Sequence, residues 1–484
     1  MAINTWKEKY KGLPKQVRAS LWFLLCSFLQ KGISVITTPI FTRLMSTTEY
    51  GNFNVFISWY NIVAVIVTLI LYSGCFTQGL VKFSDERNIF ASSLQGLTLS
   101  LVACWTFVYY IFHDFINKIL SLTTVQVLVM LLMIWTSSVF NFWATTERVE
   151  LRYKNLVILT IIVSLAKPIL GIVMVTLSSD KVTARILGLA FIEVIAYSGL
   201  FFSQLRKGKT FISKKYWRYA FFFNIPLVPH YLSQMILNGA DRIMIKKMCG
   251  SSEAGIYGLA YSIALIMTLF NSALLQTVEP WIYEKIKNKE IEVIGNVAYP
   301  SLLIICIVNL ILIAFAPEAV AFFAPKSYHE AIWIIPPVAM SVYFMYSYGL
   351  FATFEFYYEK TKLIAIATLL VAILNILLNY FCINKYGYIA AGYTTLACYV
   401  TYALFHFTIM KRICNQQLNG RQAYSIKKIT IITAILIVGG FIFTVTYFND
   451  ILRYITITIL IGILLFKRKI ILGTVNNFIL LRKK

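Results

Sequence analysis

Three basic side chains lie inside long apolar stretches of this chain, where a charge is costly. Lys31 and Lys167 sit well within two such stretches, and Arg242 lies near the end of a third. A lysine in the middle of a membrane span costs about 3 kcal/mol or more unless it faces water, a counter-ion or a ligand. If the three cations face one cavity, that cavity suits an anion with several charged oxygens, such as pyrophosphate.

Two stripes of polar residues accompany these cations. The first comprises Ser27, Lys31, Ser34, Thr38 and Thr42, and the second comprises His230, Gln234, Asn238, Asp241 and Arg242. Steps of three or four residues place each stripe on one face of a helix. We expect the stripes to line an aqueous lumen, with Lys31 and His230 at a similar depth. The alternative is that they are hydrogen-bonding seams between packed helices.

Acidic residues inside the apolar stretches are few, and this limits how the cations can be neutralised. Glu193 and Asp241 lie within such stretches, and Glu279 lies near a boundary. Taken singly, Lys167 could form an ion pair with Glu193, and Arg242 could pair with Asp241. His230 and His406 could relay protons, although a lone histidine in a helical bundle is more often a packing residue.

Apolar stretches that hold these residues fill most of the chain. About fourteen of them, each about twenty residues long, run from Leu21 to Phe466, which is the length a membrane-spanning helix needs. The chain is 59% hydrophobic and 13% charged, with a mean hydropathy of +0.74. We therefore expect an all-α polytopic membrane protein. Its expected spans include 53–76, 219–245 and 255–279, and Pro226 and Pro229 are expected to bend the second of these.

The charge pattern predicts the orientation in the membrane. The net charge is +24, but the basic residues form short clusters between the apolar stretches rather than a nucleic-acid footprint. With the N-terminus in the cytoplasm, about 32 of the 44 Lys and Arg residues fall on the cytoplasmic side, as the positive-inside rule requires. An even number of spans with both termini cytoplasmic follows, and no nucleic-acid partner is expected.

A loose internal repeat divides the chain into two halves. The segment TRLMSTTEYGNFNVFIS at 42–58 recurs as DRIMIKKMCGSSEAGIYGLAYS at 241–262. Six spans separate the copies, so two six-helix bundles with the same orientation, related by a pseudo-two-fold axis along the membrane normal, are expected. The predicted domains are an N-terminal lobe at 1–204, a basic cytoplasmic linker at 205–218, a C-terminal lobe at 219–410, and two additional helices with a basic tail at 411–484.

Three segments resemble one family of bacterial membrane proteins. ITTPIFTRLMSTTEYGNFNVF at 36–56 is similar to the opening segment of polysaccharide exporters, DRIMIKKMCGSSEAGIYGLAYSIAL at 241–265 resembles their seventh-to-eighth span junction, and TLLVAILNILLNYFCINKYGYIAAGYTTLACY at 368–399 resembles their eleventh-to-twelfth span hairpin. The chain is thus similar to the O-antigen and capsule repeat-unit flippases of the multidrug/oligosaccharidyl-lipid/polysaccharide (MOP) exporter superfamily, over essentially its whole length.

The resemblance implies a transporter rather than an enzyme. Such flippases move undecaprenyl-pyrophosphate-linked oligosaccharide across the bacterial cytoplasmic membrane, by alternating access through a cationic central cavity. The substrate-binding residues expected here are Lys31, Lys167, Arg242, Arg43, Thr38, Gln234 and Asn238. The residues expected to couple transport to an ion are Asp241, Glu193 and His230. Partners would be the lipid-linked sugar, membrane lipids, and a polysaccharide polymerase with its chain-length regulator.

Two alternatives remain open at this point. A cation-coupled multidrug antiporter of the same superfamily would be expected to depend on a membrane-embedded acid, whereas buried bases outnumber acids here. A membrane polysaccharide polymerase or ligase would be expected to carry a large catalytic outer loop, and the longest outer loop is roughly a dozen residues by the span prediction. No cofactor or metal is expected, because the sequence contains no P-loop, HExxH or GxSxG motif.

Overall fold

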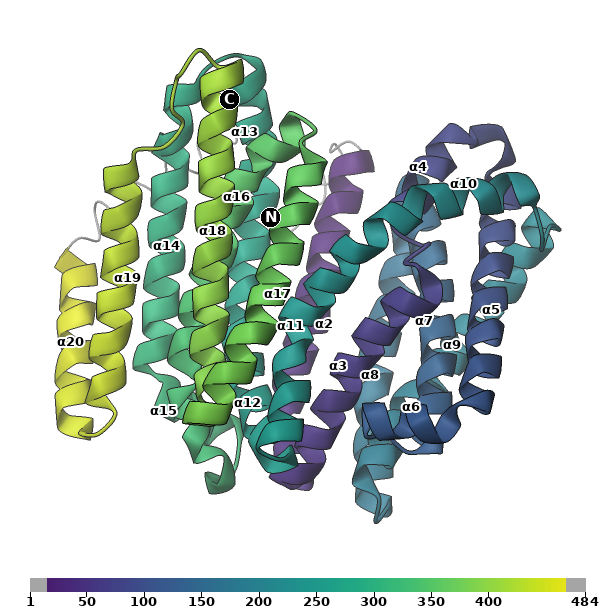
Figure 1. The fold of residues 1–484 in the computed structure, drawn as a ribbon, viewed down its shortest axis with the longest axis horizontal. Coiled ribbons are helices and arrows are strands. Elements are labelled where there is room, and N and C mark those ends of the chain that lie inside the picture. The colour runs from purple at the N-terminus through teal and green to yellow at the C-terminus, as the bar shows by residue number, and fades with distance from the viewer. Residues whose placement is uncertain (1–14, 467–484) are drawn as a thin grey trace, which may run out of the picture. The chain divides into compact units, whose positions relative to one another are not determined.

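The computed structural model describes residues 15–466, and this part of the chain is helical with no strand (Figure 1). The end of the predicted basic tail, residues 467–484, lies outside the described residues. The chain divides into two compact units, residues 1–243 and 244–484. The all-α prediction is confirmed.

The N-terminal unit contains the following elements, the last of which continues into the second unit: α2 (Lys15–Leu44), α3 (Thr47–Thr68), α4 (Cys75–Lys82), η1 (Ser84–Glu86), α5 (Arg87–Ile111), α6 (His113–Leu120), α7 (Thr124–Val149), α8 (Tyr153–Leu177), α9 (Lys181–Gly208), α10 (Lys214–Asn224), η2 (Ile225–Leu227) and α11 (Val228–Met248).

The C-terminal unit contains the remaining elements: α12 (Ser251–Ala264), η3 (Leu265–Met267), α13 (Thr268–Lys287), η4 (Ile291–Val293), α14 (Ile294–Ala314), α15 (Ala316–Phe323), η5 (Lys326–Trp333), α16 (Ile335–Tyr357), α17 (Thr361–Tyr386), α18 (Ala390–Gln417), α19 (Ile426–Thr446) and α20 (Asp450–Phe466).

The surfaces of these helices are those of a membrane protein. Nine helical segments of the described chain are long and apolar enough to cross a bilayer, or ten if the bent pair η5 and α16 forms one span. Helices α2, α11, α18 and α20 occupy the other predicted spans. On α8, the side chains of Ile158, Ile162, Leu165 and Ile169 form an exposed apolar stripe. Exposed apolar side chains at helical spacing face lipid rather than water.

Close packing of α8 against its neighbours depends on two glycines. A Cβ atom at Gly188 of α9 would lie 3.1 Å from the Cα of Gly171 on α8, so only hydrogen fits between these helices. A Cβ at Gly171 would in turn lie 3.2 Å from the ring of Phe41 on α2. Helix α8 is thereby held between α2 and α9, and this contact sets the positions of the polar residues on all three helices.

Two of the predicted spans are interrupted. The span predicted at 53–76 ends at Thr68, because Leu69 and Ile70 adopt left-handed conformations with φ of +51° and +47°. Asn224 Nδ2 donates to the carbonyl oxygens of both residues, at 2.8 Å each. Freed backbone carbonyls at membrane depth need such a donor. The span predicted at 219–245 is broken next to Asn224, where the 3-10 turn η2 contains Pro226.

A third predicted span, at 255–279, is also divided. The 3-10 turn η3 separates α12 from α13, so the helical segment 251–287 is longer than predicted and contains a local break. By contrast, Pro39 and Pro168 lie inside the uninterrupted helices α2 and α8. A proline inside a predicted span therefore does not by itself interrupt the helix in this chain.

The segment predicted to be a linker packs against the N-terminal unit. Ser92 Oγ donates to the carbonyl of Thr210 at 2.6 Å, and Trp217 Nε1 donates to the carbonyl of Ser93 at 2.9 Å. Lys215 Nζ donates to Glu86 Oε2 at 2.7 Å, and this bond raises the pKa of Lys215. These contacts explain why the boundary between the compact units lies after residue 243 rather than at 205–218.

Both copies of the sequence repeat fall on a turn between two helices. The first joins α2 to α3, where Ser46 caps α3 and exchanges hydrogen bonds with Glu49 in a capping box. The second joins α11 to α12, where Gly250 has a φ of +137° that an L side chain rarely adopts. The repeat therefore marks the same kind of junction in two places.

Helix α16 forms the centre of the C-terminal unit. It packs against α12, α13, α14, α17, α18 and α19, and most of its side chains are buried. Figure 1 shows α19 and α20 at one edge of this unit, beside α14. Burial on every side makes α16 the position where an ionisable residue is most thoroughly removed from water.

Candidate functional site

An ion pair joins α8 to α9 inside the N-terminal unit. Lys167 Nζ lies 2.6 Å from Glu193 Oε1, and Thr136 Oγ1 on α7 lies 3.1 Å from both Glu193 Oε2 and the carbonyl oxygen of Met133, so its one hydrogen is shared between these acceptors. The glutamate side chain is 6% exposed and the lysine side chain 25%. Both carboxylate oxygens therefore have a donor. The interpretation of Lys167 as the partner of Glu193 is confirmed, and this pair adds no net charge to any cavity.

Lys31 differs from Lys167. It lies in the interior of α2, its side chain is exposed, and no acid among the described residues forms an ion pair with it. Within the described part of the chain, a Cβ atom at the adjacent Gly32 would meet nothing within 4 Å. The side chain of Lys31 is exposed at a depth where an isolated charge is costly.

The other predicted residues of α2 are held against their own helix. Thr38 Oγ1 donates to the carbonyl of Ser34 at 2.8 Å, and Arg43 Nη1 donates to the carbonyl of Pro39 at 2.9 Å. Because the side chains of Thr38 and Arg43 donate hydrogen bonds to carbonyls of α2, Lys31 is the clearest candidate for ligand binding on this helix.

The second stripe lies on α11. Arg242 Nη1 donates to the carbonyl of Asn238 at 3.2 Å, and Asp241 is buried. Gln234 is half-buried. Among the described residues, the Nδ1 atom of His230 is buried and has no hydrogen-bond partner. The structure thus brings together Lys167 and Glu193, and it places Lys31 and Arg242 on the separate helices α2 and α11.

A second buried pair lies in the C-terminal unit and includes a residue that the sequence did not single out. Glu355 Oε1 on α16 lies 2.6 Å from His406 Nδ1 on α18, and both side chains are 0% exposed. His406 was identified from the sequence, but Glu355 was not. The sequence feature that could have indicated Glu355 is an acid inside the aromatic run FATFEFYY at 351–358. Such an aromatic run is also typical of the belt at a membrane boundary, where an acid is not unusual.

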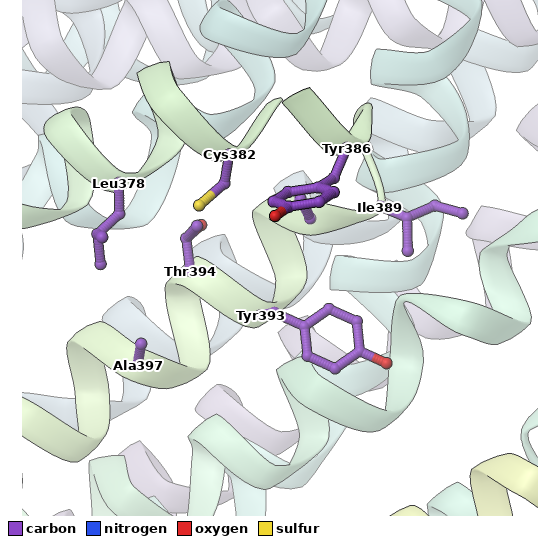
Figure 2. Close-up of a pocket in the computed structure, with 8 residues that line it drawn as sticks. Leu378, Cys382, Tyr386, Ile389, Tyr393, Thr394 and Ala397 are labelled. Carbon is purple, nitrogen blue, oxygen red and sulfur yellow. The ribbon is translucent and has the colours of Figure 1, made fainter. Parts of the chain in front are cut away.

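A pocket opens where α17 meets α18. Its volume is about 500 Å³, and it is lined by Leu378, Cys382, Tyr386, Ile389, Ala390, Tyr393, Thr394 and Ala397. Figure 2 shows Tyr386 and Tyr393 on opposite sides of this pocket. Thr394 donates to the carbonyl of Ala391 at 2.9 Å and also bonds to Asn379. With no charged side chain in its lining, the pocket is unsuited to a pyrophosphate group.

Metal ligands are not gathered in the described part of the chain. Among residues 15–466, no group of three or more His, Cys, Asp or Glu side chains could hold a metal ion.

Comparison with known proteins connects this geometry to a family. Residues 17–286, more than half of the chain, match the family model described as "Polysaccharide biosynthesis protein". A curated relative, "Lsg locus putative protein 1" of Haemophilus influenzae, is 21% identical over 387 residues, which cover 75% of this chain and 90% of the relative.

Solved structures share the fold. The lipid II flippase MurJ in an inward closed conformation matches with a TM-score of 0.69 and 16% identity, over 93% of this chain and 99% of its own. An inward-facing multidrug resistance MATE family transporter of the MOP superfamily matches with a TM-score of 0.59 and 12% identity, over 80% of this chain and 96% of its own. The fold is thus that of MOP transporters, and the predicted MOP-like architecture is confirmed.

Proposed function

Because the chain belongs to the polysaccharide biosynthesis protein family, we propose that it flips undecaprenyl-pyrophosphate-linked oligosaccharide repeat units from the cytoplasmic to the outer leaflet of the bacterial cytoplasmic membrane. A repeat unit delivered to the outer leaflet would be a substrate for polymerisation there, so we propose a polysaccharide polymerase and its chain-length regulator as partners. MurJ, which has the same fold, is a lipid II flippase.

The observation that carries this proposal is the exposed charge of Lys31. Its side chain is exposed although the residue lies in the middle of helix α2, and among the described residues no acid forms an ion pair with it. A lysine at this depth is stabilised by an anion that it binds, and a diphosphate supplies several acceptor oxygens for its three donors. A cationic drug would be repelled by the same side chain, which favours the flippase over the multidrug antiporter.

The other predicted ligands contribute unequally to this proposal. We propose that Arg242 and Arg43 approach the substrate as secondary cations, with Thr38, Gln234 and Asn238 donating hydrogen bonds to its sugars. Lys167 is committed to Glu193 in this conformation. Lys167 could bind substrate only by exchanging that carboxylate for a phosphate, so we assign the main substrate-binding role to Lys31.

Transport by alternating access requires the substrate headgroup to cross the bilayer while the prenyl chain stays in lipid. We propose that both termini lie in the cytoplasm, as the distribution of basic residues indicates.

The binding energy of one lysine for a diphosphate must be modest, because a carrier that holds its substrate too tightly in either leaflet cannot release it.

Complementation tests the function and the site together. Cells that lack their own repeat-unit flippase would express wild type, Lys31→Ala, Lys31→Arg or the control Lys154→Ala, which removes an exposed cation at the beginning of α8. We expect wild type and Lys154→Ala to restore surface polysaccharide. Lys31→Ala should reduce it about tenfold or more, and Lys31→Arg should retain part of it, since the charge is kept.

Accumulation of lipid-linked sugar in the cytoplasmic leaflet is the second readout. It should rise in the Lys31→Ala cells, because synthesis continues while flipping stops. Normal surface polysaccharide with Lys31→Ala would remove Lys31 from the site and leave the flippase. Failure of wild type to complement, together with resistance of the cells to cationic drugs, would overturn the flippase proposal itself.

A further inference from the structure

The Glu355 and His406 pair is the most deeply buried ionisable contact of the C-terminal unit. The two side chains are 0% exposed, and 2.6 Å separates Glu355 Oε1 from His406 Nδ1. It links α16 to α18, the two helices of this unit that pack most extensively on each other. An ionisable pair inside a membrane helix bundle is costly to retain and marks a functional site by default.

Aromatic rings enclose the imidazole of His406. The ring of Tyr348 on α16 stacks on it at 5.6 Å between centroids, and the ring of Tyr402 on α18 meets it edge-on at 4.5 Å. A hydrogen bond of 2.9 Å joins the hydroxyl of Tyr402 to the hydroxyl of Thr368 on α17. The titratable groups that face the pair are thus tyrosines, which stay neutral near pH 7.

Two further tyrosines pack near α16 without a hydrogen bond to the pair. On the α13 side, Tyr283 packs on Tyr357 and donates to Glu279 at 2.9 Å. On the α19 side, Tyr424 packs on Phe351 and Phe354 of α16. Among the described residues, neither Glu355 nor His406 forms an ion pair with a third group. The charge of this site is therefore set by the protons that the pair itself holds.

The outer atoms of the pair lack partners. Among the described residues, Glu355 Oε2 and His406 Nε2 are both buried without a hydrogen bond. A net charge is disfavoured at such a position, so in this conformation the pair holds the proton that makes it neutral overall. In that state His406 Nε2 carries a hydrogen that has no acceptor, which costs free energy in this conformation.

We propose that Glu355 and His406 form a proton-binding site whose occupancy is coupled to the conformation of the C-terminal unit. On release, the N–H bond at His406 Nε2 breaks and its proton passes to water. Nδ1 keeps its hydrogen and donates it to the Glu355 carboxylate, so the site goes from neutral to one negative charge. Because Nε2 is buried in this conformation, release requires α16 and α18 to separate locally. Proton binding therefore favours this closed arrangement.

Proton binding itself can be tested without any transport substrate. The chain has four histidines, so purified full-length protein labelled with ¹⁵N-histidine in phospholipid vesicles gives a small set of ring signals, and His406→Gln identifies the signal of His406. We expect the Nε2 signal to change protonation state once between about pH 5 and pH 9 in wild type. In Glu355→Gln it should stay neutral throughout, because the counter-charge is lost. A His406 that keeps one protonation state over this range in wild type would overturn the proposal.

The coupling part rests on the flippase function proposed above, and the complementation cells test it. Surface polysaccharide would be measured against external pH for wild type, Glu355→Gln, His406→Gln and the control Tyr348→Phe, which keeps the ring stacked on His406 and removes its hydroxyl. We expect Glu355→Gln and His406→Gln to flatten the pH dependence and to lower flipping about tenfold, with wild-type amounts of protein in the membrane. Tyr348→Phe should behave as wild type.

The outcomes separate the two proposals. Well-expressed Glu355→Gln and His406→Gln variants with the pH dependence of wild type would show that the pair only joins α16 to α18, and would overturn the coupling. A wild-type protein that fails to complement yet titrates at His406 would overturn the flippase function while the proton site stands.

Discussion

Among the described residues, Lys167 with Glu193 in the N-terminal unit and His406 with Glu355 in the C-terminal unit are pairs with a buried acid, and the two pairs are built differently. In the N-terminal unit, each oxygen of Glu193 lies within hydrogen-bond distance of a donor, Lys167 or Thr136. In the C-terminal unit, Glu355 bonds to His406, and among the described residues each member of the pair has an outer polar atom without a hydrogen-bond partner. The first pair is satisfied in this conformation, and the second is not.

This difference shows that burial alone does not distinguish an ion pair that stabilises the fold from one that binds and releases a proton. A lysine holds its proton at neutral pH when a carboxylate is beside it, whereas a histidine exchanges its proton in that range. The N-terminal pair is therefore expected to keep its charges through a transport cycle and to fix α7, α8 and α9 together. The C-terminal pair can change its charge, and a change of charge can move helices.

The largest expected effect comes from Glu193→Gln. The amide keeps the volume of the side chain and can accept from Thr136, but it leaves Lys167 with no counter-ion. Breaking a buried ion pair from one side destabilises a protein by about 3 kcal/mol. We expect a loss of this size in the free energy of unfolding, measured by denaturant titration of the purified protein in detergent.

The double variant Lys167→Met/Glu193→Leu is the control for that prediction. It removes both charges and fills a similar volume, so most of the lost stability should return. If Glu193→Gln is as stable as wild type, the lysine finds another partner or water, and the N-terminal pair does not have the structural role we assign to it.

A smaller effect is expected from Thr136→Val, which keeps the shape of the side chain and removes its hydroxyl. Glu193 Oε2 then loses its donor at 3.1 Å while the ion pair with Lys167 remains. A hydrogen bond to a charged group contributes about 1.5 kcal/mol. We expect a loss of that order in the same titration.

The matched control is Ser138→Ala on the same helix, because the hydroxyl of Ser138 donates to the carbonyl of Ile134 of its own helix. It should cost less than Thr136→Val. Equal losses from the two variants would mean that the carboxylate gains nothing from Thr136.

Much of the fold could be predicted from the sequence, because a bilayer demands long apolar helices and leaves a clear pattern. The interruptions within the predicted spans could not be predicted from the sequence. The end of α3 depends on Asn224, which lies 155 residues from the backbone carbonyl of Leu69 that it caps. The apolar residues Leu69 and Ile70 carry no local signal for their left-handed conformations.

The two pairs were predictable to different degrees for a similar reason. Glu193 is among the few acids inside apolar stretches, so its pairing with Lys167 could be proposed from charge alone. Glu355 lies in an aromatic run near a predicted boundary, where an acid can reach water. That it is fully buried against His406, 51 residues away, depends on the packing of α16 and α18.

The smallest expected effect on stability comes from Glu355→Gln. The loss of the carboxylate removes the partner of a charged imidazole, but His406 can release its proton and remain in place as a neutral ring. The amide can then donate to Nδ1. We expect a cost of about 1 kcal/mol, well below that of Glu193→Gln, in the same denaturant titration at neutral pH. A cost equal to that of Glu193→Gln would mean that His406 cannot discharge. Both pairs would then be fixed ion pairs, and the contrast between the two units would disappear.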